Sequence, residues 1–128
     1  MKRSPKSKNH TTKQKGDLAE DRALAYLLDQ GMVLLQRNYR TPGRGGGEID
    51  LVMRGRDQTL VFVEVRCRES ALFGGANASI GPTKRRRIVR AAQFYLHRLG
   101  YLPACRFDVV CIDAGGLQWL PAAFDANG

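Results

Sequence analysis

The sequence is poor in the residues that build disulfide frameworks and zinc sites. Its three cysteines, Cys67, Cys105 and Cys111, are an odd number without a CxxC spacing, and its only histidines are His10 and His97. Neither a disulfide-stapled domain nor a zinc site is therefore expected. No stretch approaches the roughly 20 apolar residues of a membrane-spanning helix, and no apolar run follows the basic N-terminus. We expect a protein of the reducing cytoplasm with no membrane partner.

Acidic residues are scarce relative to basic ones. The 128 residues contain 21 Lys and Arg against 12 Asp and Glu, a net charge of +9, and 43% of the residues are hydrophobic. This size and apolar content suit one globular domain and exclude collagen-like or wholly disordered chains. Residues 1–16 hold six of the cations and no acid. We expect them to form a disordered basic arm ahead of a single domain over residues 17–125.

Hydrophobic periodicity predicts an α/β fold, with a mixed sheet flanked by helices. The expected elements are helices over residues 17–30 and 83–100, strands over 32–39, 49–53, 60–65 and 106–113, and an edge strand over 117–120. From Pro121 onward we expect the chain to fray. The stretch 67–82 has no sustained period and reads as a long surface loop, a feature that is often functional.

Carboxylates interrupt two strands that are otherwise apolar. Asp50 lies within Ile49-Asp50-Leu51, and Glu64 lies within Val63-Glu64-Val65. In an even hairpin register the two carboxylates share one face a few ångströms apart, and a divalent cation would relieve their repulsion. The alternative interpretation is that Asp50 or Glu64 simply pairs with an arginine at a sheet edge. The arginines available for that pairing are Arg66, Arg68 and Arg106.

A third carboxylate, Glu20, sits at the margin of the core-facing stripe of the first predicted helix. There it could join the other two. Alternatively, the spacing Asp17-Leu18-Ala19-Glu20 is that of a capping box, in which Glu20 bonds back to the backbone of Asp17. The sequence leaves both interpretations open.

The second predicted helix opens with five cations in seven residues. They are Lys84, Arg85, Arg86, Arg87 and Arg90. Cations at a helix N-terminus oppose the helix dipole, which favours a bound anion there. Lys84 and Arg85 continue the apolar stripe toward the sheet edge, whereas Arg86 and Arg90 face outward with Gln93. Together with the arm, this cluster predicts contacts to nucleic-acid phosphates. The alternative is a merely solubilising helix face and terminus.

Four stretches, taken in order, resemble a known family. They are residues 15–20 (KGDLAE), 47–52 (GEIDLV), 61–66 (VFVEVR) and 106–110 (RFDVV). On these residues the chain resembles the YraN-like family of uncharacterised bacterial proteins, within the restriction-endonuclease-like, or PD-(D/E)xK, superfamily. The resemblance covers residues 14–125 and implies an αβββαβ core.

The resemblance also implies a site. Asp50, Glu64 and the Val65 carbonyl would hold Mg²⁺, Glu20 would assist directly or through water, and a metal-activated water would hydrolyse a phosphodiester. Arg66 stands where the superfamily usually has lysine; arginine can stabilise charge on the phosphate but cannot give up a proton. Asp108 matches a family stretch without an assigned role, and a structural pair with Arg106 or another arginine is the simpler interpretation.

The sequence therefore supports two functions. The first is a divalent-metal-dependent endonuclease acting on DNA, with Glu20, Asp50, Glu64 and Arg66 as the catalytic set. The second is a DNA- or RNA-binding module of the same fold without turnover, and the residue at position 66 separates the two. A scaffold for protein partners is disfavoured by the excess of positive charge. The oligomeric state, a homodimer included, stays open.

Overall fold

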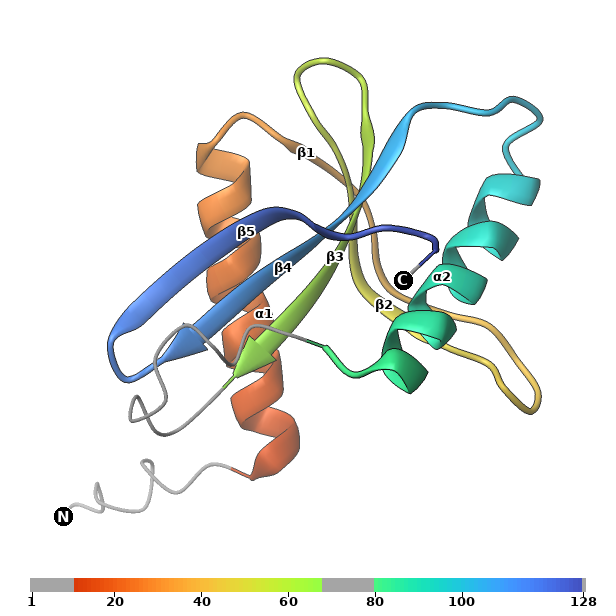
Figure 1. Ribbon diagram of the computed structural model, residues 1–128. Helices are drawn as coiled ribbons and strands as arrows, with labels where there is room; N and C mark the ends of the chain where they lie inside the picture. The colour runs from red at the N-terminus through yellow and green to blue at the C-terminus, as the bar shows by residue number, and fades with distance from the viewer. Residues whose placement is uncertain (1–10, 68–79, 128) are drawn as a thin grey trace, which may run out of the picture.

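The computed structural model describes residues 11–67 and 80–127. Its elements are α1 (Thr12–Asp29), β1 (Val33–Arg40), β2 (Glu48–Arg54), β3 (Leu60–Cys67), α2 (Pro82–His97), β4 (Cys105–Asp113) and β5 (Gly116–Phe124). The first six follow the predicted αβββαβ order, and β5 adds a strand after them (Figure 1). No helix in the described part of the chain is long and apolar enough to cross a membrane.

The strands form one mixed sheet in the order β1-β2-β3-β4-β5. Only β3 and β4 are parallel, because α2 carries the chain back between them, and the other neighbours are antiparallel hairpins. The tight turn between β2 and β3 is closed by Gly55, whose N–H donates to the carbonyl of Thr59 at 2.8 Å. The mixed α/β sheet predicted from periodicity is thus confirmed.

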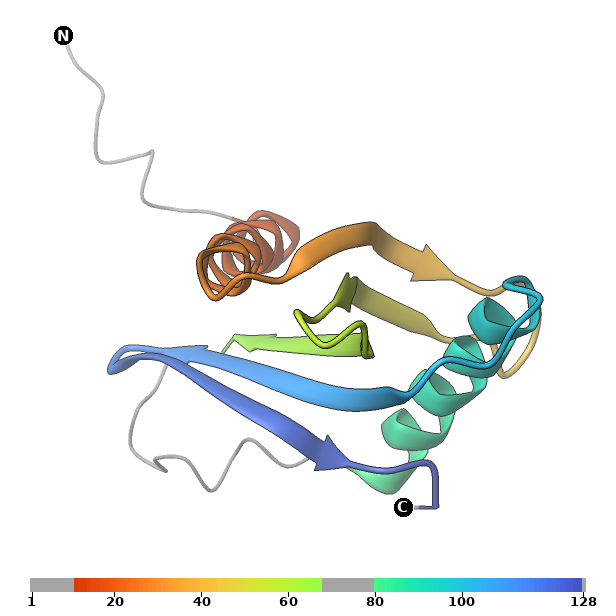
Figure 2. The same ribbon diagram turned by 90° about the horizontal axis from the view of Figure 1, so that it is seen from above.

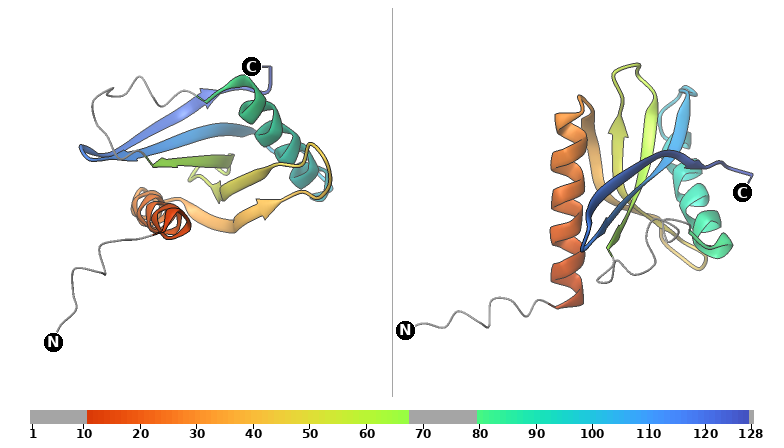
Figure 3. Two further views of the ribbon diagram at one scale, coloured as in Figure 1. Left: turned by 90° about the horizontal axis from the view of Figure 1, so that it is seen from below. Right: turned by 60° about the vertical axis from the view of Figure 1, so that its left-hand side comes forward.

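Each face of the sheet is covered by one helix. Ala23 and Leu27 of α1 pack on one face in a cluster that includes Leu51, and Ile88 of α2 packs on the other in a cluster that includes Phe62. Side chains alternate between the two faces along β3 and from Leu51 to Met53 of β2, which is why both faces of these central strands are apolar. Figure 3 (right) shows the helices on opposite sides of the sheet, and Figure 2 shows its twist.

Helix α1 begins five residues before the predicted start at Asp17. Thr11 is its N-cap: the N–H of Gln14 donates to Thr11 Oγ1 at 3.1 Å, and the N–H of Thr11 donates to Gln14 Oε1 at 2.8 Å. Residues 12–16 of the predicted arm are therefore helical. Residues 1–10 of the arm and residues 68–79 of the predicted long loop lie outside the described residues.

The prediction that the chain frays from Pro121 is wrong. Strand β5 continues to Phe124, and the N–H of Ala122 donates to Asp108 Oδ1 at 2.9 Å. Pro121 is accommodated because β5 is an edge strand, where a missing N–H breaks no pairing on the open side. At the other helix, α2 ends at His97, three residues short of Gly100.

Candidate functional site

The predicted carboxylates meet where β2 and β3 part. The backbone pairing ends at Leu51 opposite Val63, and the same register carried one step further sets Asp50 opposite Glu64. Beyond this last pair a side chain, not the backbone, links the two strands: Asp50 Oδ2 accepts the N–H of Val65 at 2.8 Å. The register is even, as the metal-site interpretation required.

Asp50 carries an unusual proton affinity. Burial and the neighbouring charge of Glu64 raise the pKa of Asp50 from 3.8 to about 7, although the hydrogen bond from the Val65 N–H acts to lower it. Two carboxylates so placed resist holding two negative charges at once. Near pH 7 Asp50 is therefore protonated in about half of the molecules, and a cation could replace that proton.

Glu64 has a cationic partner, but it is not one of the arginines predicted for it. Lys84 of α2 places Nζ 2.8 Å from Glu64 Oε2, while the Glu64 side chain is 5% exposed and that of Lys84 is 56% exposed. Burial acts to lower the pKa of Lys84, yet the hydrogen bond and charge of Glu64 outweigh it and the pKa is raised. Of the arginines expected as partners, Arg106 instead pairs with Asp108, and Arg68 lies outside the described residues.

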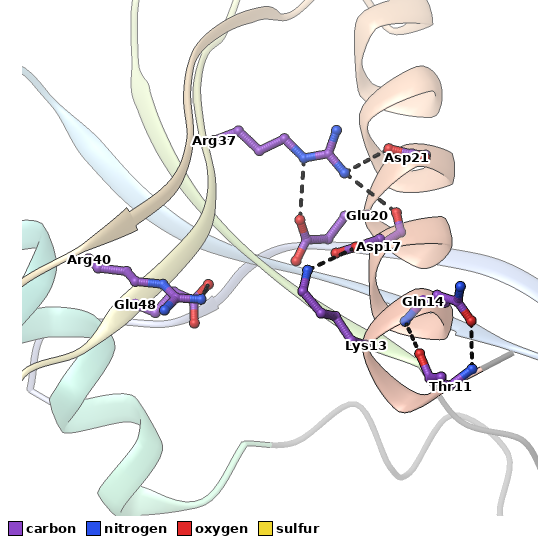
Figure 4. Close-up of polar contacts among 9 residues, drawn as sticks. All are labelled: Thr11, Lys13, Gln14, Asp17, Glu20, Asp21, Arg37, Arg40 and Glu48. Carbon is purple, nitrogen blue, oxygen red and sulfur yellow. Dashed lines mark hydrogen bonds and ion pairs between the residues drawn. The ribbon is translucent and has the colours of Figure 1, made fainter.

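Glu20 does not cap its helix, so the capping-box interpretation is wrong. Thr11 is the cap, and Glu20 lies further along α1 with its side chain 13% exposed. Arg37 of β1 holds it, with Nε 3.3 Å from Glu20 Oε1, and also binds Asp21 (Figure 4). Burial and the charge of Asp50 raise the pKa of Glu20, which places the two carboxylates in one electrostatic neighbourhood.

A fourth carboxylate, Glu48, belongs to this neighbourhood and was not predicted. Its charge raises the pKa of both Asp50 and Glu20. The Asn38 amide, oriented to satisfy its neighbours, donates to Glu20 Oε1 and Glu48 Oε2, 3.2 Å from each. The spacing Glu48-Ile49-Asp50 at the start of a strand was the signal that could have pointed to it.

Asn38 explains how carboxylates from both sides of the sheet converge. Its φ is 55°, a conformation that asparagine tolerates better than most residues. Regular alternation would put Arg37 and Tyr39 on the same face. Instead Arg37 bonds to α1 while Tyr39 packs in the cluster under α2. This end of the sheet is thus reached by Glu20 from α1 and by Lys84 from α2.

The carboxylates open into a hollow of about 550 Å³ between α2 and the β1–β2 loop. Glu48, Asp50 and Glu64 line it, and so do the cations Arg40, Lys84 and Arg87. Part of the wall is glycine, since a Cβ on Gly47 would lie 2.2 Å from the carbonyl oxygen of Arg87. Only glycine lets the loop approach α2 this closely, and Figure 1 shows the two side by side.

The predicted basic cluster divides between two surfaces. Lys84 and Arg87 line the hollow, whereas Arg86 and Arg90 are exposed and line a separate one. Arg85 is half-buried. The inward direction predicted for Lys84 and the outward one for Arg86 and Arg90 are therefore observed.

Arg66 lies on the same strand as Glu64 and close enough to Lys84 for the two charges to interact. It follows Glu64 by two residues on β3, so alternation sets both on one side of the strand. Its positive charge acts against protonation of Lys84, which places the two cations near each other. The hollow thus has Lys84 in contact with Glu64 and Arg66 nearby.

Comparison with known proteins identifies the family. Residues 19–112 match Uncharacterised protein family UPF0102. The chain belongs to this family. It is 63% identical over 117 residues to a UPF0102 protein of Paracidovorax citrulli, covering 91% of this chain and 87% of that one. It is also 63% identical over 116 residues to one of Albidiferax ferrireducens, covering 91% of each. The resemblance to the YraN-like family is thereby confirmed.

The donor set of this UPF0102 protein suits a hard cation. Mg²⁺ is commonly held by one or two carboxylates, with water and phosphate oxygens completing its shell. Asp50 and Glu64 supply two such carboxylates, and a cation would offset the burial and the neighbouring charge of Glu64 that together raise the pKa of Asp50. Within residues 11–67 and 80–127 no three or more His, Cys, Asp or Glu side chains converge as a ligand group, so the fit rests on this pair. The Val65 carbonyl stays a predicted ligand, whereas its N–H is seen to bond Asp50.

Asp108 has a structural position. It is fully buried on β4 and accepts from Arg106 Nε at 2.9 Å and Nη2 at 3.2 Å, from Trp119 Nε1 at 2.9 Å and from the Ala122 N–H at 2.9 Å. These bonds join β4 to β5 and agree with the structural pairing with Arg106. Asp108 therefore serves the sheet edge in this UPF0102 protein.

Proposed function

We propose that this protein binds DNA and hydrolyses a phosphodiester bond at the Asp50–Glu64 pair with the aid of a divalent cation. The observation that carries the proposal is the buried carboxylate pair, with the pKa of Asp50 near 7, in a hollow that Arg40, Lys84 and Arg87 also line. Carboxylates that bind a cation, flanked by cations that bind phosphate, are the two halves of a phosphodiesterase site.

Each residue has a role set by its geometry. Asp50 and Glu64 would hold Mg²⁺, which when bound neutralises phosphate charge and activates a water. The Val65 N–H fixes Oδ2 of Asp50, so the carboxylate is oriented before any ligand arrives. Lys84 would exchange its bond to Glu64 for one to a phosphate oxygen. Glu20, with its raised pKa, would accept a proton or hydrogen bond from water at the edge of the pair.

One observation favours the alternative, a binding module without turnover. Lys84 already supplies a positive charge to Glu64 at 2.8 Å, so the pair is partly neutralised without a metal ion. Arg66, nearby, cannot act as a base at any ordinary pH. In that case the hollow would bind phosphate through its cations alone.

A cleavage assay separates the two functions. Wild type, Asp50→Asn and Glu64→Gln are incubated with Mg²⁺ or Mn²⁺ and single-stranded, duplex and branched DNA, and with RNA. Asp57→Asn, an acid-to-amide change in the exposed turn after β2, is the matched control. We expect metal-dependent cleavage by wild type and Asp57→Asn, and a loss of at least about 100-fold in the other two.

The binding arm of the same assay decides what remains if cleavage is absent. Should wild type and Arg66→Lys cleave none of these substrates while binding of DNA persists, the nuclease proposal is overturned in favour of the binding module. Should no binding be measurable at low salt, both functions are overturned.

A further inference from the structure

Helix α2 carries a second surface that the proposed site does not use. Phe94 is exposed at 50% although it is one of the larger apolar side chains. It lines a hollow of about 480 Å³ together with Arg86, Arg90 and Gln93 from the same helix, with Val89 and Ala126 completing the lining. These residues follow helical spacing, so they form one stripe along the outer side of α2.

This stripe adjoins the carboxylate hollow. A Cβ on Gly45 would lie 3.6 Å from Arg90 Nη1, so the Arg90 guanidinium lies against the β1–β2 loop. The next residues of that loop, Gly46 and Gly47, line the carboxylate hollow. Arg87, one turn before Arg90, lines the carboxylate hollow as well. A strand whose phosphate lies at Lys84 and Arg87 could therefore continue over Arg90 onto the stripe.

The chemistry of the stripe fits a nucleobase better than a protein segment. An exposed aromatic face, two planar guanidinium groups and one amide can stack on a base, bind its phosphate and bond its edge. An apolar partner helix would have to remove water from Arg86, Arg90 and Gln93. The free energy lost by desolvating these polar groups exceeds the free energy gained by burying one phenyl ring. Helix α2 contains no acidic residue that would repel a phosphate. One acidic residue, Asp125, lines the adjoining hollow beside Arg86.

We propose that Phe94, with Arg86, Arg90 and Gln93, is a binding site for an unpaired nucleotide of the strand whose phosphate enters the carboxylate hollow. This inference rests on the proposed function and names its substrate class: nucleic acid with unstacked bases, either single-stranded or at the unpaired part of a branch. A continuous duplex keeps its bases stacked, so it meets the phosphate-binding cations but not Phe94.

Binding in EDTA, where no cleavage occurs, tests the inference. Fluorescence anisotropy is measured with a labelled single strand, its blunt duplex, and the same single strand with abasic sites. We expect Phe94→Ala to weaken single-strand binding about tenfold and duplex binding less than twofold, with Phe94→Trp restoring it. Tyr101→Ala, which removes an aromatic ring 67% exposed and outside the stripe, is the matched control and should change neither.

The abasic strand tests for base stacking directly. A general loss of charge or of folding would weaken binding of the normal and the abasic strand alike. Wild type should bind it about as weakly as Phe94→Ala binds the normal strand, and Phe94→Ala should not distinguish the two strands. The inference is overturned if Phe94→Ala weakens single strand and duplex equally, or weakens neither. In that outcome wild-type binding still supports the DNA-binding part of the proposed function, whereas absence of wild-type binding to any DNA defeats the proposed function itself.

Discussion

The ammonium group of Lys84 lies 2.8 Å from Oε2 of Glu64, and this ion pair joins α2 to the central strand β3. The two partners differ in solvation, because Glu64 is buried and more than half of the Lys84 side chain meets water. A half-exposed lysine can leave its partner at modest cost, whereas a buried glutamate cannot be left without a counter-charge. The pair can therefore exchange its cation, a property that suits both metal binding and phosphate binding.

Removing the ammonium group should destabilise the protein in a pH-dependent way. We expect Lys84→Met to lower the free energy of unfolding by about 1–3 kcal/mol at pH 8, because Glu64 stays buried without a counter-charge. The loss should shrink at pH 5, where the carboxylate pair can take up protons. Urea titrations at the two pH values measure it. Lys84→Arg keeps the ion pair and Arg86→Met removes an exposed neighbour, so a comparable loss in either control would contradict the prediction.

The proton affinity of Asp50 predicts a second pH dependence. Its pKa is about 7 in the folded protein, against 3.8 for an aspartate in an unfolded chain. Between these pH values the folded state therefore binds more protons than the unfolded state. The free energy of unfolding should therefore fall as pH rises from about 4 to about 7, by at most about 1.4 kcal/mol per pH unit, and level off above that range.

Asp50→Asn isolates this contribution. The amide can still accept the Val65 N–H through its oxygen, and its nitrogen can donate toward Glu64, so the variant resembles protonated Asp50. Urea titrations of both proteins in EDTA from pH 4.5 to 8 should show the variant gaining stability relative to wild type as pH rises. A difference that does not change with pH would show that Asp50 titrates normally.

The strand pattern predicted that Asp50 and Glu64 lie together, because side chains in a strand alternate between the two faces of a sheet. Each acid interrupts an apolar strand, and the turn at Gly55 pairs those strands directly, so one register decides whether the acids face each other. The mixed sheet followed in the same way from helix and strand order. Local patterns of this kind depend on neighbours in sequence and are readable there.

The partners of these acidic residues could not be predicted from the sequence. Lys84 reaches Glu64 from an element far along the chain, and a helical stripe gives the direction of a side chain but not the strand beneath it. The Asn38 amide joins Glu20 to Glu48, and the positive φ of Asn38 is a departure from strand geometry that alternation does not predict. The sequence analysis missed the N-cap at Thr11 because Lys13 and Lys15 make the first turn of α1 similar in composition to the basic arm before it.

Asp108 should be among the most sensitive polar residues of the fold. Asp108→Asn leaves the buried position without its charge, and the new amide cannot accept from Arg106, Trp119 and Ala122 together. We expect a loss of about 2–4 kcal/mol in the free energy of unfolding, measured by urea titration. Asp113→Asn is the control: it lies on the same strand but is only partly buried, and its amide oxygen can still accept the Gly115 N–H of the following turn, so it should cost under about 1 kcal/mol.

Positive charge outside the carboxylate hollow should govern DNA affinity through salt. Deleting residues 1–10 removes Lys2, Arg3, Lys6 and Lys8. Because each phosphate contact releases counterions, the deletion should weaken binding and flatten the dependence of affinity on salt concentration, with little effect on sequence preference. Anisotropy titrations at several salt concentrations give the slope. An unchanged slope would mean that these cations do not contact phosphates.

Glu64→Gln separates a metal-binding pair from a purely structural ion pair. Because its partner Lys84 is half-exposed, the change leaves no buried unpaired charge, and it also removes the charge of Glu64, which together with burial raises the pKa of Asp50. We therefore expect the thermal midpoint in EDTA at pH 8 to stay within a few degrees of wild type or to rise. A ligand that binds only the folded state raises its stability, so Mg²⁺ should raise the midpoint of wild type and leave that of Glu64→Gln unchanged. Asp57→Asn should respond to Mg²⁺ as wild type does. If Mg²⁺ shifts none of the three, or shifts Glu64→Gln equally, the pair does not bind the metal; a strong loss of stability in EDTA would make Glu64 a structural partner of Lys84.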